Sequence, residues 1–418
     1  MPTKNSGLST YRWVIEALLI ITLVVQVMTW LAPAPILAPM LKSLNINLSQ
    51  AGLIISVIAL CIGIFSFVGA LVTERLGTLR TLILGVWFLG VGEILSGYTH
   101  TFLPLLGCRV LEGIGYGIII GPPTTLVMEW FGEREWPYIN TVNALCAYIG
   151  LTVVFTITPP IYYALGSSWN TLMKVYGLAV VVVAVLWMIL GRRWQSDAVA
   201  EIAEIRTPST LPQVLRIREV VLVAIALFGG MWVFQLYTAF LPEFFHVMRG
   251  LTLSQSSNLT AVLPFTGIFG AFAGGIGTSV VGLRRPFLWP LAIVTLIGCL
   301  GAVLLTDLNL MRASLVLVGI GASGGLAAIG TLMMELPGMT PAKMATAFSF
   351  VWAVGYTGAF ISPVLGGAIA GVLGLRDVML VFLVLQLLPL VTFYILPETG
   401  PGRRRPPVTE PMQQAAQH

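Results

Sequence analysis

The segment RVLEGIGYG places a full positive charge, Arg109, three residues before a full negative charge, Glu112. Apolar sequence surrounds the pair, with TFLPLLGC before it and IIIGPP after it. On a helix the two side chains lie about 60° apart, so they share a face. A charge in the middle of a hydrocarbon core costs at least about 2.5–3.5 kcal/mol, which pairing or contact with water reduces. We therefore expect this face to point into the protein or into water.

Two interpretations of this pair stay open. In the first, the pair only holds its helix against the neighbouring helices. In the second, Arg109 organises a pocket or attracts an anion, and Glu112 exchanges a proton. Glu93, in VGEILSG, is either a second protonatable group or a partner for polar atoms of another helix. Glu16 follows Arg12 by one turn, and we expect it to extend toward the membrane surface.

The composition indicates what kind of element carries these charges. The chain has 418 residues, of which 57% are hydrophobic and only 9% are charged, whereas soluble domains are about 25% charged. The hydrophobic residues form long blocks, and most basic residues lie between them. A net charge of +5 therefore relates to membrane topology, and we expect no nucleic-acid partner. All four cysteines lie in apolar runs without metal-ligand spacing, which argues against a disulfide framework or a metal site.

Twelve segments are long enough to cross a hydrocarbon core of about 30 Å, which requires about 20 residues. The predicted fold is therefore an all-α integral membrane protein with twelve transmembrane helices in two pseudo-symmetric six-helix bundles. The predicted spans are residues 13–38, 51–73, 80–98, 102–129, 138–164, 171–191, 219–241, 256–281, 286–305, 311–335, 343–372 and 377–396.

The basic residues predict the orientation and the domain boundaries. An even number of spans puts both termini on one side, and 16 of the 22 basic residues then fall on that side. The positive-inside rule assigns it to the cytoplasm of a cell inner (plasma) membrane. The hydrophilic stretch after span 6 divides the chain into two bundles, residues 1–191 and 219–398. Residues 192–218 form a cytoplasmic linker, and 399–418 form a polar, proline-rich tail that we expect to be disordered.

The two halves of the sequence resemble each other. TLVMEWFG (125–132) ends span 4, and TLMMELPG (331–338) ends span 10, at an offset of 206 residues. ALVTERLGTLR (70–80) matches GIGTSVVGLRR (275–285) at an offset of 205. A parallel duplication of a six-helix unit places a substrate cavity between the halves, near the middle of the bilayer. We expect the face that carries Arg109 and Glu112 to turn toward the cleft between the halves.

These motifs resemble the major facilitator superfamily over all twelve spans. ALVTERLGTLRTLILG is similar to the family signature between spans 2 and 3, with Glu74 at the usual Asp position. RVLEGIGYG is similar to the span-4 pattern, with Glu112 in place of the usual Gln. The overall pattern also resembles the cyanate and nitrate-type permease branches. The resemblance implies alternating access by rocking of two bundles, and it implies a role in proton coupling for Arg109.

The repeat and the expected depth of each residue suggest two further sets of candidates. Charges at the cytoplasmic ends of spans 4 and 10 could pair with those of the matching loops and close that side, or they could only stabilise helix ends. The gate candidates are Glu74, Arg75, Arg80, Glu129, Arg284, Arg285 and Glu335. Polar and aromatic residues near the middle of the membrane could line a substrate pocket, or they could only fill the core. These candidates are Gln26, Trp30, Tyr116, Asn143, Tyr148, Trp232, Gln235, Trp352 and Tyr356.

The sequence favours a monomeric secondary transporter in the lipid bilayer that takes up a small solute, with an anion as the preferred candidate, together with protons. Efflux of drugs or metabolites is the alternative, although span 5 (GLTVVFTITPPIYYALG) lacks the glycine pair that family antiporters tend to carry. A receptor or scaffold without transport is a third possibility, which Glu112 disfavours. No ATP-binding motif, histidine cluster or nucleophile motif occurs, so we expect neither an enzyme nor a cofactor.

Overall fold

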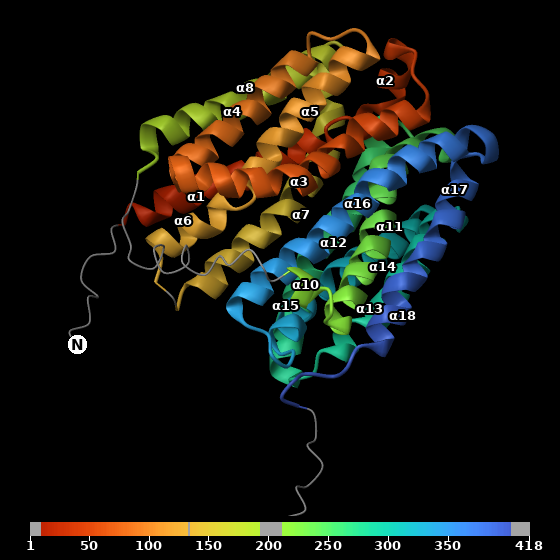
Figure 1. Ribbon diagram of the computed structural model, residues 1–418. Helices are drawn as coiled ribbons and strands as arrows, with labels where there is room; N and C mark the ends of the chain where they lie inside the picture. The colour runs from red at the N-terminus through yellow and green to blue at the C-terminus, as the bar shows by residue number, and fades with distance from the viewer. Residues whose placement is uncertain (1–9, 133, 193–210, 403–418) are drawn as a thin grey trace, which may run out of the picture.

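The computed structural model describes residues 10–132, 134–192 and 211–402, and in these ranges it contains helices and no strands (Figure 1). Most of the predicted linker and of the predicted tail lies outside the described residues. The first group of helices comprises α1 (Arg12–Leu31), η1 (Ala34–Ile36), α2 (Leu37–Leu44), α3 (Leu48–Leu76), α4 (Thr78–Ser96), α5 (Phe102–Ile119), α6 (Pro122–Trp130), α7 (Trp136–Ala164) and α8 (Trp169–Leu190). The short α10 (Leu211–Val214) precedes the second group.

The second group comprises α11 (Arg218–Arg249), α12 (Leu253–Val281), η2 (Arg285–Phe287), α13 (Trp289–Leu304), α14 (Leu308–Gly324), α15 (Leu326–Met334), α16 (Pro341–Leu373), α17 (Leu375–Phe382), η3 (Leu383–Gln386) and α18 (Leu387–Ile395). Among the described residues these helices make twelve segments long and apolar enough to cross a membrane, which confirms the predicted fold class. The largest difference in a span end is at α11, which continues to Arg249 instead of stopping at 241. Phe244 and Phe245 are fully buried there, and Gly250, with φ of 66°, ends the helix.

Spans 4 and 10 break at glycines or prolines. Span 4 divides into α5 and α6 around Gly121 and Pro122, and span 10 divides into α14 and α15 at Gly325. The equivalent breaks strengthen the resemblance between the two halves. In contrast, α7 continues as a helix through Pro159 and Pro160, as membrane helices can when neighbours satisfy the freed carbonyls.

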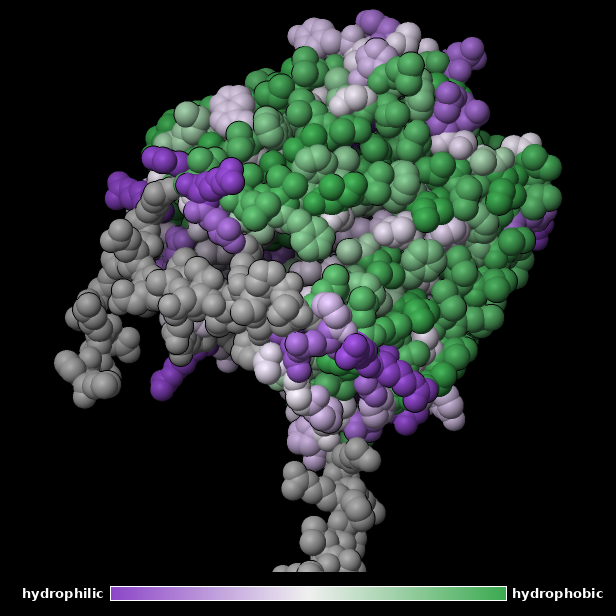
Figure 2. All heavy atoms as spheres, viewed as in Figure 1, coloured by the Kyte–Doolittle hydropathy of each residue, from purple (hydrophilic) through white to green (hydrophobic). Residues whose placement is uncertain are grey.

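The sides of the protein are apolar. Figure 2 shows hydrophobic residues over the flanks of both bundles, with charged residues gathered toward their ends. On α8, for example, Leu178, Val182 and Ile189 are exposed. A soluble protein rarely exposes apolar surface of this extent. Surface of this kind is stable in lipid, which agrees with a multi-pass membrane protein.

The two bundles meet mainly where α3 crosses α16 and α7 crosses α12. Gly52 lies directly against the backbone carbonyl of Pro363, and the Ser49 hydroxyl donates to the Val364 carbonyl at 3.0 Å. These contacts lie near the first residues of α3, at the end of the bundles away from the chain termini. Phe67 lies farther along α3, one turn after Gly63, and its side chain is 56% exposed.

On α16, Phe348 is also exposed, two turns before Tyr356. The seam between the bundles therefore closes away from the termini and opens toward them. We call this seam the cleft. Figure 1 shows α3 and α16 side by side at this seam.

Candidate functional site

Arg109 and two glutamates form a charged cluster inside the N-terminal bundle. Arg109 and Glu112 lie on α5 and Glu93 lies on α4, and all three residues are completely buried. Arg109 Nη1 donates to Glu112 Oε2 at 2.6 Å and to Glu93 Oε2 at 3.2 Å. The Ser96 hydroxyl donates to the other Glu112 oxygen at 2.9 Å. We call Arg109, Glu93 and Glu112 the charged triad.

Arg109 also donates to the backbone of two other helices. Nη1 donates to the Thr29 carbonyl at 3.0 Å, Nη2 donates to the Trp30 carbonyl, and Nε donates to the Ile54 carbonyl at 3.2 Å. The residue four positions after Thr29 is Pro33, which has no N–H, so the helix cannot satisfy that carbonyl itself. A cation at the carboxyl end of α1 also complements the helix dipole. Arg109 thus joins α1, α3, α4 and α5.

The triad has one positive group and two acidic groups. The Glu93 and Glu112 carboxyl groups lie close together, because both accept a hydrogen bond from the same Arg109 nitrogen. Because a net charge in a dry interior is costly, one proton on this pair gives the neutral and favourable state. The charges of the triad therefore balance when one of its two carboxyl groups is protonated.

The triad does not face the cleft. The face of RVLEGIGYG that carries the charges was expected to turn toward the cleft between the halves. The structure instead places these charges within the N-terminal bundle, where the Arg109 side chain is 1% exposed. The glycines that follow explain the close packing. A Cβ atom on Gly113 would lie 2.6 Å from the Cβ of Cys61 on α3, and one on Gly115 would lie 2.6 Å from a carbonyl oxygen of α4.

An aromatic cluster lies beside the triad and reaches the second bundle. The rings of Trp30 and Tyr116 are 5.5 Å apart, and Trp30 is 6.5 Å from Tyr356 on α16. Tyr356 in turn lies 5.9 Å from Trp352. Gln26 lies next to the Tyr116 hydroxyl. Five of the nine predicted pocket residues are therefore contiguous, and they connect both bundles across the cleft.

The other four predicted pocket residues lie on α7 and α11. Trp232 and Gln235 are buried in α11, where the Trp232 ring packs 5.2 Å from Phe382. Tyr148 on α7 packs against Gly267 of α12, at the contact between the bundles. Asn143 lies nearer the terminal side of α7.

Asn143 lies beside Glu16, where the structure corrects an expectation. The Glu16 side chain was expected to extend to the membrane surface, but the residue is only 3% exposed. The Glu16 side chain faces α7 because α1 packs along that helix. Arg12 could have paired with Glu16 near the membrane surface, but it pairs instead with Glu135 at 2.9 Å. Among the described residues, no side chain forms a hydrogen bond of normal geometry with the Glu16 oxygens.

The predicted gate residues pair within a bundle. Arg284 makes a two-point ion pair with Glu335, at 2.7 and 3.2 Å, and the Thr399 hydroxyl donates to the same carboxylate at 2.7 Å. These contacts lower the pKa of Glu335, chiefly through the hydrogen bonds from Arg284. In the N-terminal bundle, the Thr78 hydroxyl donates to Glu129 at 2.9 Å.

The remaining gate candidates lie near these pairs. Glu74, Arg75 and Arg80 are exposed where α3 ends and α4 begins. Arg285 donates its backbone N–H to Glu398 at 3.0 Å. Sequence reasoning missed Glu398 and Thr399, although they follow the last span in a P-E-T-G run that is common in the resembled family.

Comparisons with known proteins agree with this architecture. The family described as Major Facilitator Superfamily matches residues 18–356. The chain is 25% identical to the hexuronate transporter of Bacillus subtilis over 59% of its own length and 60% of the relative's. It is 24% identical to the probable L-galactonate transporter of Escherichia coli, over 55% of the chain and 52% of that protein. The chain thus matches a little over half the length of these curated relatives.

A longer match covers 87% of both chains, at 23% identity, with the 4-hydroxybenzoate transporter PcaK of Pseudomonas aeruginosa. The fold is shared with a bacterial homolog of the human lysosomal transporter Spinster, with a TM-score of 0.81 and 14% identity over 93% of this chain and 97% of that one. The family match covers more than three quarters of the sequence, and the twelve spans share the fold of the Spinster homolog. The chain therefore belongs to the major facilitator superfamily.

Proposed function

We propose that this protein carries a small organic anion into the cell together with a proton, by alternating access of its two bundles. The charged triad is the observation that carries the proposal. A structural ion pair needs one acid for one base, but Arg109 has two buried carboxyl partners. The second carboxyl group has a physical role if a proton binds to it and leaves it during the cycle.

The aromatic cluster connects the triad to the solute. Arg109 donates to the backbone carbonyl of Trp30, whose ring contacts both Tyr116 and Tyr356. Rocking of the bundles moves α16 relative to α1 and therefore moves Tyr356 relative to Trp30. A change in protonation of the triad can then bias the cleft toward one of its two open states.

The relatives support an acidic solute. Their names include transporters of hexuronate, galactonate and 4-hydroxybenzoate, all of which are organic anions. The hydroxyl and amide groups of Tyr116 and Gln26 can donate hydrogen bonds to a carboxylate in the cleft. An anion that enters together with one proton crosses as a neutral pair, which limits the cost of moving charge through the bilayer.

The basic residues support the orientation. With both termini in the cytoplasm of the inner membrane, the cleft as described opens to the cytoplasm, and the ion pair Arg284–Glu335 lies at that side. We also propose the two bundles, residues 1–191 and 219–398, as the moving units of a monomer, with residues 192–218 as their linker and 399–418 as a tail.

Uptake into proteoliposomes tests this function. Purified protein is reconstituted with an acidic exterior, and radiolabelled monocarboxylates, sugar acids and a cationic dye are offered in turn. We expect accumulation of at least one anion, abolished by a protonophore. Extrusion of the dye with no anion uptake would refute the proposal in favour of drug efflux.

A further inference from the structure

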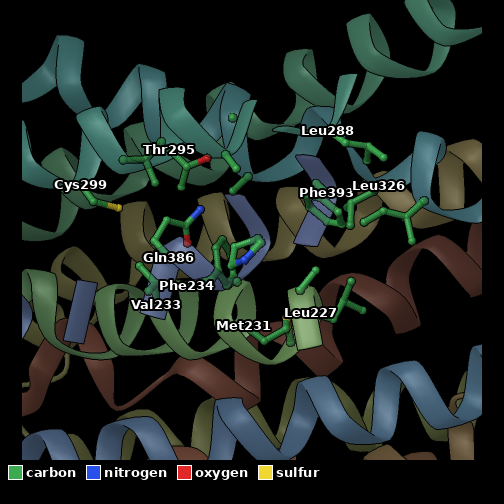
Figure 3. Close-up of a pocket in the computed structure, with 18 of the residues that line it drawn as sticks. Leu227, Met231, Val233, Phe234, Leu288, Thr295, Cys299, Leu326, Gln386 and Phe393 are labelled. Carbon is green, nitrogen blue, oxygen red and sulfur yellow. The ribbon is translucent and has the colours of Figure 1, made fainter. Parts of the chain in front are cut away.

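The C-terminal bundle contains a cavity of about 150 Å³ (Figure 3). It lies among α11, α13, α14 and α18, and most of its walls are apolar. Apolar cavities of about this volume stay dry and can take up a benzene ring. The residues that set its apolar character include Leu227, Met231, Phe234, Leu288, Val318 and Phe393.

Two polar side chains interrupt this apolar wall. Gln386 is 4% exposed, and its side-chain oxygen has no hydrogen-bond partner among the described residues. Figure 3 shows the Gln386 amide projecting into the space that Thr295 borders from the opposite side. The Thr295 hydroxyl donates to the Leu291 carbonyl at 2.9 Å, which leaves its oxygen free to accept. A buried polar atom without a partner is costly, and a ligand with one matching polar substituent would remove that cost.

The cavity adjoins the cleft. Tyr148 and Trp352 contribute to its lining, and Trp352 continues through Tyr356 to Trp30 of the other bundle. A solute in the cleft could thus place one end in the cavity without leaving the contact between the bundles. Tyr148 belongs to α7, so both bundles would contact such a solute.

We propose that this cavity receives a ring-sized apolar group of the transported anion, and that Gln386 binds a polar substituent on that ring. The inference rests on the proposed function and narrows its substrate class to monocyclic aromatic or similarly compact apolar acids. A sugar acid fits poorly, because its several hydroxyl groups would meet apolar walls and only two polar side chains.

Ligand-dependent thermal stability of the purified, full-length protein tests the cavity without transport. The probes are phenylacetate, 4-hydroxyphenylacetate and glucuronate, which carry the same charge. Ala322 on α14 lines the cavity, so Ala322→Leu fills part of it. Ala313→Leu is the matched control, because Ala313 lies on the exposed face of the same helix.

We expect the two ring acids to raise the unfolding temperature of the unaltered protein, and Ala322→Leu to weaken their binding at least tenfold, with no change for Ala313→Leu. Gln386→Leu, which keeps the shape of the side chain, should remove the preference for 4-hydroxyphenylacetate over phenylacetate. Equal binding of all three acids, or no effect of either cavity variant, would overturn the inference. Cavity-dependent binding without proton-driven uptake would instead refute the proposed function and leave the cavity site intact.

Discussion

Replacement of Arg109 by methionine removes the only cation of the charged triad and keeps an apolar side chain of similar length. The change deletes five hydrogen bonds, three to backbone carbonyls and two to carboxyl groups. Removing one partner of a buried ion pair costs about 3–5 kcal/mol, since the remaining charge stays uncompensated. Because the carboxyl pair can take up protons, part of that charge penalty is relieved, but the Thr29 carbonyl still loses its donor. We expect a loss of about 3–5 kcal/mol in the free energy of unfolding.

Denaturant titration in mixed micelles, followed by tryptophan fluorescence, measures this loss. Arg109→Lys is the matched control, because it keeps the charge but has one nitrogen in place of three. Arg109→Lys should lower the free energy of unfolding less than Arg109→Met, because it keeps the positive charge. It should still lower it somewhat, because lysine cannot replace all of the hydrogen bonds to several helices. A loss below about 1 kcal/mol for Arg109→Met, within the range of an exposed ion pair, would refute the view that Arg109 joins four helices.

Three further perturbations test other parts of the structure. Gly274→Val puts a side chain against a backbone carbonyl of α14 and should lower the free energy of unfolding by about 1–3 kcal/mol, measured by thermal unfolding. Gly330→Val is the control and should change stability little, because the space around Gly330 is open. Glu335→Gln should destabilise by about 1 kcal/mol at neutral pH. Because Arg284 lowers the pKa of Glu335, that difference should disappear as the pH falls below the ordinary value of 4.5, and a difference that persists in acid would contradict the ion pair. Glu16→Gln replaces a buried carboxyl group that has no described cation partner, so the unfolding temperature should stay the same or rise, and a fall of several degrees would show that the acid is needed.

The membrane-spanning elements could be predicted from the sequence because each depends on local composition. All twelve spans follow from the length of an apolar block, and the helices begin and end near the predicted residues. The pairing of Arg109 with Glu112 also follows locally, because helical spacing fixes which side chains share a face. The same is true of the close packing at Gly113.

The direction of each face could not be predicted, because it depends on which helices surround it. Periodicity shows that Arg109 faces away from lipid, but only packing decides between the bundle interior and the cleft. The Thr29 carbonyl, four residues before Pro33, could have been used as a signal for the bundle interior, because it requires a donor from another helix. The burial of Glu16 and the cavity around Gln386 both depend on long-range packing and have no local pattern.

Proton-driven accumulation by Glu112→Gln tests the central claim most directly. One proton carried with a monovalent anion gives about tenfold accumulation for a gradient of one pH unit, which is about 1.4 kcal/mol. We predict about tenfold accumulation by the unaltered protein and by the control Glu135→Gln, whose acid pairs with Arg12 outside the triad. Glu112→Gln should lose accumulation, with a ratio of about one, while it still exchanges anion across the membrane, since the amide cannot release a proton. Accumulation of about tenfold by Glu112→Gln would contradict the account, because Glu112 would then not carry the proton.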